Sequence, residues 1–146
     1  MTRDERISAA ALVTVFVALL LVGLVSGTVL RHMVQVVPVL AASLVVVLRP
    51  AWNRFAAMPV FASWLVIMLL IWLYLLGLAR VITGQFSPAE VGLTAVIGLA
   101  CMVGLGASVR DSKRSGWGTG LAAFLIFGAL QGGAMWLSLR PALASR

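Results

Sequence analysis

The sequence predicts an all-α integral membrane protein, a bundle of five transmembrane helices in one polytopic domain covering residues 1–146. Two observations carry this. Hydrophobic residues make up 62% of the chain and charged residues only 10%, against roughly 25% charged residues in soluble domains. The mean hydropathy is +1.12, and the apolar residues gather into five long runs. Soluble, disordered and fibrous classes are therefore excluded.

The first predicted span is 7–30, which follows a short polar segment carrying Arg3 and Arg6. Such a start resembles a secretory signal. The apolar run is too long for a signal-peptide core, however, and no Ala-x-Ala cleavage site follows it. We therefore expect an uncleaved first span.

The second predicted span is 33–49, and its apolar part is short. Sixteen residues, 33–48, reach about 24 Å at the helical rise, less than the ~30 Å hydrocarbon core. Pro38 removes one backbone donor and favours a kink. With Arg49 snorkelling at the far end, the run just spans. The alternative is a protein of four spans in which 33–48 is re-entrant or interfacial.

The third predicted span, 60–79, is the most apolar, and it begins just after Pro59, which suits the first turn of a helix. The fourth, 89–109, follows Ser87-Pro88-Ala89-Glu90, the pattern of a capping box. The fifth, 121–139, follows the only clearly polar loop, 110–120, where we expect Trp117 to anchor an interfacial turn.

Five spans place alternate connections on the same side of the membrane. One side then carries seven basic residues: Arg3, Arg6, Arg49, Arg54, Arg110, Lys113 and Arg114. The other carries four: Arg31, Arg80, Arg140 and Arg146. The positive-inside rule therefore predicts a cytoplasmic N-terminus and an external C-terminus. The preference for arginine over lysine suggests a GC-rich genome, and hence a bacterial inner (plasma) membrane. Without the second span the split is five to six, and the rule decides nothing.

Titratable groups are sparse, and none lies in the middle third of an apolar run. The only acids are Asp4, Glu5, Glu90 and Asp111. We assign the first two to an N-terminal tail, Glu90 to the capping box and Asp111 to a loop. A single histidine and a single cysteine give too few ligands for a zinc site. We therefore expect no catalytic residues, no metal site and no cofactor.

The basic residues that remain are predicted to contact lipid or a partner protein. Arg110, Lys113 and Arg114 suit anionic lipid head groups, and Arg31 with His32 suits a lipid phosphate or a partner's carboxylate. Because the arginines lie singly or in small groups between apolar runs, nucleic acid is not an expected partner.

Small residues at helical spacing predict close helix packing. The candidates are Gly23 and Gly27 in the first span, Ala100, Gly104 and Ser108 in the fourth, and Gly128, Gln131 and Gly132 in the fifth. The Gln131 amide lies near mid-membrane and calls for a partner such as Ser43 or a backbone carbonyl. These faces pack either within one bundle or against another membrane protein, including a second copy.

The leading functional hypothesis is a small polytopic subunit, scaffold or assembly factor of a membrane complex, without a catalytic site. The first alternative is a component of an oligomeric channel or transporter, whose pore is lined by Ser, Thr and Gln131. The second is an interfacial lipid-modifying enzyme that uses Arg31 and His32 together with Arg80 and Glu90.

Overall fold

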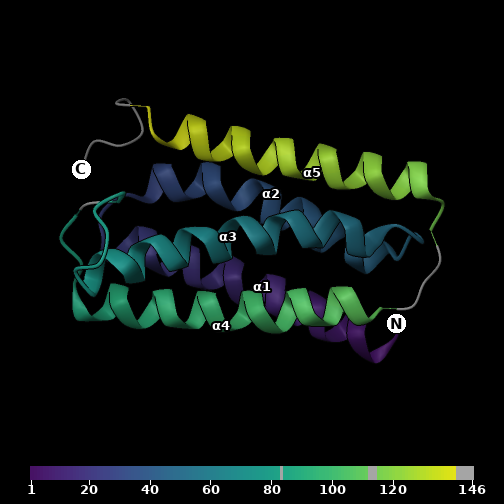
Figure 1. Cartoon of the computed structure of the whole chain (residues 1–146), viewed down its shortest axis with the longest axis horizontal. Coiled ribbons are helices and arrows are strands. Elements are labelled where there is room, and N and C mark those ends of the chain that lie inside the picture. Colours follow the sequence, from purple (N-terminus) through teal and green to yellow (C-terminus); the bar gives the residue numbers. More distant parts are fainter. Residues whose placement is uncertain (83, 112–114, 141–146) are drawn as a thin grey trace.

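The computed structural model describes residues 1–82, 84–111 and 115–140, and it forms a bundle of long helices (Figure 1). Within these residues there are five helices and no strand. The helices are α1 (Arg3–Val25), α2 (Val29–Leu48), α3 (Asn53–Leu75), α4 (Pro88–Arg110) and α5 (Trp117–Ser138).

The helices run alternately up and down the bundle, so each connection lies at one of its two ends (Figure 1). The first end, called here the N-terminal end, holds the start of α1, the α2–α3 connection, the end of α4 and the start of α5. The opposite end holds the other connections and the end of α5. Helix α1 packs mainly against α2 and α4, and α3 packs against α2, α4 and α5. Helix α5 contacts only α2 and α3 in the described part of the chain, and it is the least buried of the five helices, so we call it the outermost helix.

All five helices are long and apolar enough to cross a membrane, as the sequence predicted. Helix α2, the doubtful case, is long enough to cross a membrane, since it continues through Pro38 for 20 residues, or about 30 Å. It begins at Val29 rather than at 33, so Arg31 and His32 lie inside the helix and not before it. A re-entrant segment would turn back halfway, whereas α2 runs from one end of the bundle to the other (Figure 1).

Like α2, helices α1 and α3 begin earlier than the apolar runs predicted. Helix α1 starts at Arg3, so Asp4 and Glu5 belong to its first turn and not to a tail. Helix α3 starts at Asn53, which places Pro59 inside the helix instead of in its first turn. Hydropathy missed both starts because these first turns contain polar residues.

Three further boundaries differ from the expected ones by four residues or more. Helix α3 ends at Leu75 and not at residue 79. Helix α1 ends at Val25, before residue 30, because Gly27 adopts a left-handed φ of 69° and turns the chain. The Thr28 N–H then donates to the Gly23 carbonyl at 2.9 Å, which closes the helix end. Helix α5 starts at Trp117, so this tryptophan belongs to the first turn of a helix and not to an interfacial turn. Its side chain is 94% exposed.

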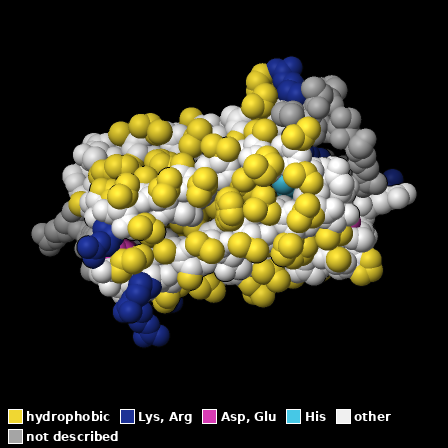
Figure 2. Space-filling model, turned by 180° about the vertical axis from the view of Figure 1, so that it is seen from behind, with side chains coloured by type: hydrophobic (Ala, Val, Ile, Leu, Met, Phe, Trp, Pro, Cys, Tyr) yellow, Lys and Arg dark blue, Asp and Glu magenta, His cyan; other side chains and the backbone are white. Residues whose placement is uncertain are grey.

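The bundle has a compact apolar core and an apolar outer surface. Leu12, Val39, Phe61 and Ile97 are almost fully buried between the helices. Figure 2 shows exposed hydrophobic side chains over the middle of one face, with Lys and Arg side chains toward the two ends. This distribution suits a surrounding hydrocarbon layer with polar boundaries on both sides.

Candidate functional site

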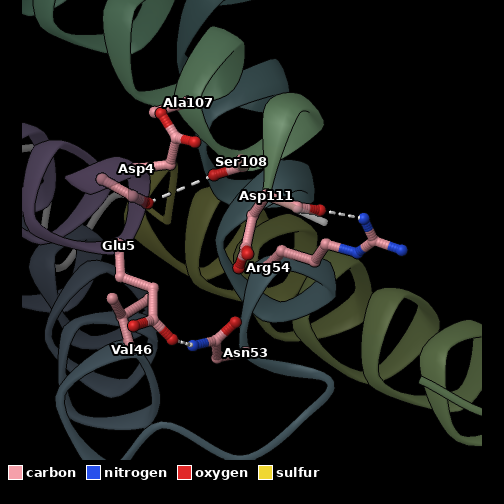
Figure 3. A pocket seen from close by; sticks show the side chains of 9 residues that line it. Asp4, Glu5, Val46, Asn53, Arg54, Ala107, Ser108 and Asp111 are labelled. Atoms are coloured by element: carbon pink, nitrogen blue, oxygen red, sulfur yellow. Dashed lines mark hydrogen bonds between the residues drawn. The ribbon is translucent and has the colours of Figure 1, made fainter. Parts of the chain in front are cut away.

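The N-terminal end of the bundle contains a cluster of buried polar residues around a small cavity of about 10 Å³ (Figure 3). Helices α1, α2, α3 and α4 all contribute to its wall. The lining residues are Asp4, Glu5, Ser8, Val46, Asn53, Arg54, Ala107, Ser108 and Asp111. We call this set the end cluster.

Glu5 connects the start of α1 to the start of α3. One carboxylate oxygen accepts from the Thr2 N–H at 2.7 Å, and the Thr2 hydroxyl accepts from the Glu5 N–H at 3.1 Å. This reciprocal capping box fixes the first turn of α1. The other oxygen accepts from Asn53 Nδ2 at 2.8 Å (Figure 3), although Glu5 and Asn53 are 48 positions apart.

Two serines connect α1 to α4 beside this pair. The Ser8 and Ser108 hydroxyls lie 3.1 Å apart, and both side chains are buried. Ser108 also donates to the Gly104 carbonyl one turn back at 2.9 Å. Because its proton is used there, Ser8 is the donor of the hydrogen bond between the two helices.

Arg54 carries the positive charge in the cavity wall. Its Nη1 donates to the backbone carbonyl of Asp111 at the end of α4 (Figure 3), and its guanidinium lies 4.7 Å from the centre of the Phe55 ring. Arg54 Nε and Asn53 Oδ1 are both buried, and neither has a hydrogen-bond partner among the described residues. Asn53 and Arg54 thus contribute one buried acceptor and one buried donor without a partner among the described residues.

The end cluster is polar and contains three carboxylate residues, Asp4, Glu5 and Asp111. No group of three or more His, Cys, Asp or Glu in the described ranges could hold a metal ion. The cavity is also far too small for a drug-sized or lipid substrate. Its chemistry is that of hydrogen bonding between helix ends.

The opposite end brings Arg31, His32 and Glu90 near one another. His32 Nδ1 lies 3.1 Å from the Thr28 hydroxyl and 3.0 Å from the Thr28 carbonyl. Arg31 and Glu90 are the charged groups that act electrostatically on His32. The Glu90 carboxylate accepts from the Ser87 N–H at 2.7 Å, which confirms the predicted capping box. Arg80, also at this end, is exposed beside an open hollow next to Tyr74.

A second group of buried polar side chains lies where α2, α3 and α5 pack. Gln35 Nε2 donates to the Ser138 hydroxyl at 2.9 Å. Gln131 is 0% exposed, and neither end of its amide has a partner within the described residues. Ser43, the partner considered from the sequence, donates instead to the Val39 carbonyl of its own helix at 2.8 Å.

Three of the predicted packing residues lie close to a neighbouring helix. Gly23 contacts His32, Gly104 lies under the Phe61 ring, and Ser108 meets Ser8. Ala100 is half-buried against the core.

In each of the two Gly-x-x-x-Gly pairs, only one glycine faces another part of the bundle. In the first, Gly27 is a helix terminator and only Gly23 packs. In the second, Gly128 faces Pro59 at an ordinary 3.7 Å, whereas Gly132 has no heavy atom within 4 Å beyond its own helix.

The predicted basic loop is only partly visible. Arg110 is exposed at the end of α4. Lys113 and Arg114 lie outside the described residues. Cys101 is fully buried in the apolar core.

Sequence reasoning missed the end cluster as a unit. Thr2-Arg-Asp-Glu5 is a capping-box pattern that was readable in the sequence. Asn53 and Arg54 had no such signal, because they were assigned to a connector and not to the start of α3.

In comparisons with protein-family models, curated proteins and solved structures, nothing matched this chain.

Proposed function

We propose that this protein is a five-span integral membrane protein that serves as a subunit or scaffold of a membrane complex. Its outermost helix, α5, is the docking surface, and a second membrane protein covers it. The exposed small-residue surface of α5 is the observation that supports this most directly.

Helix α5 differs from the other four in how little of it the bundle covers. Only 22% of its most apolar window is buried, compared with 33–44% for the others. Its outer surface contains Ala129, Gly132 and Gly133, all exposed, and a Cβ added at either glycine would meet no neighbouring heavy atom within 4 Å. Small residues allow a neighbouring backbone to approach closely, which is what drives helix association in lipid.

Large apolar side chains flank these small residues. Ile126 and Trp136 are 63% and 61% exposed on α5. A flat centre between bulky flanks is suited to a transmembrane helix, whose own ridge of side chains fits between them. We define the outer face of α5 as Ile126, Ala129, Gly132, Gly133 and Trp136.

The proposed location is a bacterial inner membrane, with the N-terminal end of the bundle in the cytoplasm. Among the described residues, five basic residues lie at that end and three at the opposite one. Anionic lipid head groups are the proposed contacts of the basic residues, since juxtamembrane Arg and Lys are attracted to them.

Site-specific photo-crosslinking in native membranes tests the docking surface. A photoreactive residue at Ile126 should give a discrete protein adduct, whereas one at Val103, which is 57% exposed on α4, should not. The absence of any protein adduct from α5, or equal adducts from both helices, would contradict the proposal.

Matched glycine variants separate docking from folding. Gly132→Leu and Gly133→Leu should abolish the adduct by filling the flat surface. Gly92→Leu is the control, because Gly92 is also exposed and has open space around it, but lies on α4. An adduct that persists in both α5 variants would contradict the proposal.

A further inference from the structure

We propose that the open hollow in the connection from α3 to α4 is a binding site for an anionic phospholipid. Arg80 receives the phosphate of the head group, and exposed apolar side chains of the same connection contact the acyl chains. The site rests on the membrane insertion proposed above, and it is separate from the docking surface on α5. It lies at the end of the bundle opposite the N-terminal end (Figure 1).

The hollow has the size and charge that a lipid head group requires. Its volume is about 600 Å³, within the range of about 300–1,000 Å³ that is usual for small-molecule sites. The residues that line it are Tyr74, Leu75, Gly77, Arg80, Gly84 and Phe86. Arg80 is the one charged residue of this set, so the lining contains a cation and no acid. A ligand with a negative group therefore complements it.

Two contacts of Tyr74 hold one wall of the hollow together. The Tyr74 hydroxyl donates to the Gly84 carbonyl at 2.9 Å. Its ring centre lies 6.1 Å from that of Phe86, with the two rings tilted by 56°. These contacts join the last turn of α3 to the residues just before α4. The aromatic wall also suits a membrane boundary, where tyrosine side chains are enriched.

The end of α3 is closed by a turn that leads the chain to Arg80. Gly77 adopts a left-handed φ of 74°, which glycine tolerates without strain. The Leu78 N–H donates to the Leu73 carbonyl at 2.9 Å, which satisfies an acceptor at the helix end. The position of the backbone that carries Arg80 is therefore set by the end of the helix.

Arg80 differs from the other exposed arginine at this end of the bundle. The Arg140 guanidinium lies 3.9 Å from the centre of the Trp136 ring, so it already packs on a protein group. Arg80 is exposed, and no hydrogen bond or ion pair joins it to another residue within the described ranges. A guanidinium binds a phosphate through two parallel hydrogen bonds, and Arg80 lines a hollow that has room for one.

Exposed apolar side chains near Arg80 in the chain favour a lipid over free phosphate. Leu76, Leu78 and Val81 are 65%, 72% and 73% exposed, and all three follow the end of α3. A free phosphate would leave them uncovered, whereas the acyl chains of a phospholipid would remove them from water. An amphiphile with a negative head group therefore satisfies both the cation and the apolar side chains of this connection.

Native mass spectrometry of the purified full chain in detergent tests the site. Wild-type protein should bind phosphatidylglycerol more tightly than phosphatidylcholine, whose choline group neutralises its phosphate. Arg80→Gln should weaken the binding of phosphatidylglycerol about tenfold, because a charge-assisted contact is lost. Arg140→Gln is the control, since it removes an exposed arginine at the same end and should leave the affinity unchanged. Equal affinities of the Arg80 variant and the wild type would overturn the proposal.

Two further measurements distinguish a phospholipid from a soluble phosphate. Leu78→Ser should weaken the binding of phosphatidylglycerol severalfold, because acyl-chain contacts are lost. Leu139→Ser is its control, since Leu139 is 63% exposed and follows α5 at the same end. Glycerol phosphate, which has no acyl chains, should not displace the lipid. Displacement by glycerol phosphate, or an unchanged affinity of the Leu78 variant, would overturn the lipid assignment and indicate a soluble phosphate ester.

These measurements are independent of the docking proposal. They use purified protein with no second membrane protein present, whereas the photo-crosslinking of α5 uses native membranes. A failure of lipid binding at Arg80 would therefore leave the crosslinking result unaffected, and the absence of an α5 adduct would leave the lipid titration unaffected.

Discussion

At Gly104, helices α3 and α4 lie so close together that only the hydrogen side chain of glycine fits. A Cβ built at Gly104 would overlap the Phe61 ring, which is itself 0% exposed. Gly106, two residues along the same helix, has open space around its Cα. The two glycines therefore form a matched pair in which only one is required by packing.

We expect Gly104→Ala to lower the free energy of unfolding in detergent by about 1–3 kcal/mol, because the buried ring cannot move away without strain. Gly106→Ala should be neutral or stabilising by up to about 1 kcal/mol, since alanine favours a helix and nothing blocks its methyl group. Unfolding titrations of both variants in the same detergent measure this. Equal stability of the two would contradict the packing of α3 on α4.

Gln131 presents the reverse situation, a polar side chain whose removal should cost nothing. Its amide is fully buried with no partner within the described residues, so leucine removes two unpaired groups at nearly the same volume. We expect Gln131→Leu to be neutral or to raise the free energy of unfolding by about 1 kcal/mol. A loss of more than about 1 kcal/mol would show that the amide has a partner in the membrane. The same unfolding titration, with Ser43→Ala as a control that deletes a hydroxyl bonded to its own helix, measures this.

For the individual helices, hydropathy predicted the apolar middle of each helix well, but it missed the polar first turns at which α1 and α3 begin. The capping box at Ser87 was recognised because an apolar run follows it directly, and α4 begins at Pro88, one residue from the expected start. The box at Thr2 has the same pattern. It was missed because Arg3, Asp4 and Arg6 made the segment look like a tail.

The partners of the polar residues could not be predicted, because they join distant parts of the chain. Asn53 bonds Glu5 across 48 positions, and Ser8 meets Ser108 across 100. No periodicity connects such residues, since each pairing depends on the register between two helices. The end cluster therefore becomes visible only when α1, α3 and α4 are packed together.

The register of α1 against α4 can be tested directly by cross-linking. In a Cys101→Ala background, Ser8→Cys with Ser108→Cys should form a disulfide on mild oxidation, because the two hydroxyls are 3.1 Å apart. Ser8→Cys with Val109→Cys is the control, since Val109 is the next residue and is 61% exposed. Gel mobility with and without reductant reports the bond. A register shifted by one residue would reverse the two results.

For the molecule as a whole, the proposed membrane orientation makes a prediction that can be tested. The alternating helices fix which connections share an end, so the described basic residues can be counted at each end. Five lie at the N-terminal end and three at the opposite end. Positive charge is retained on the cytoplasmic side during insertion, which favours a cytoplasmic N-terminus.

Single cysteines in the Cys101→Ala background test this orientation in intact cells. Ser115→Cys lies at the N-terminal end just before α5, and Gly84→Cys is exposed at the opposite end. A membrane-impermeant maleimide should label Gly84→Cys in intact cells but Ser115→Cys only after permeabilisation, because the bilayer separates the two ends. The reverse pattern would invert the orientation. Labelling of both in intact cells would mean that the bundle does not span the membrane, and the docking proposal for α5 would then fail with it.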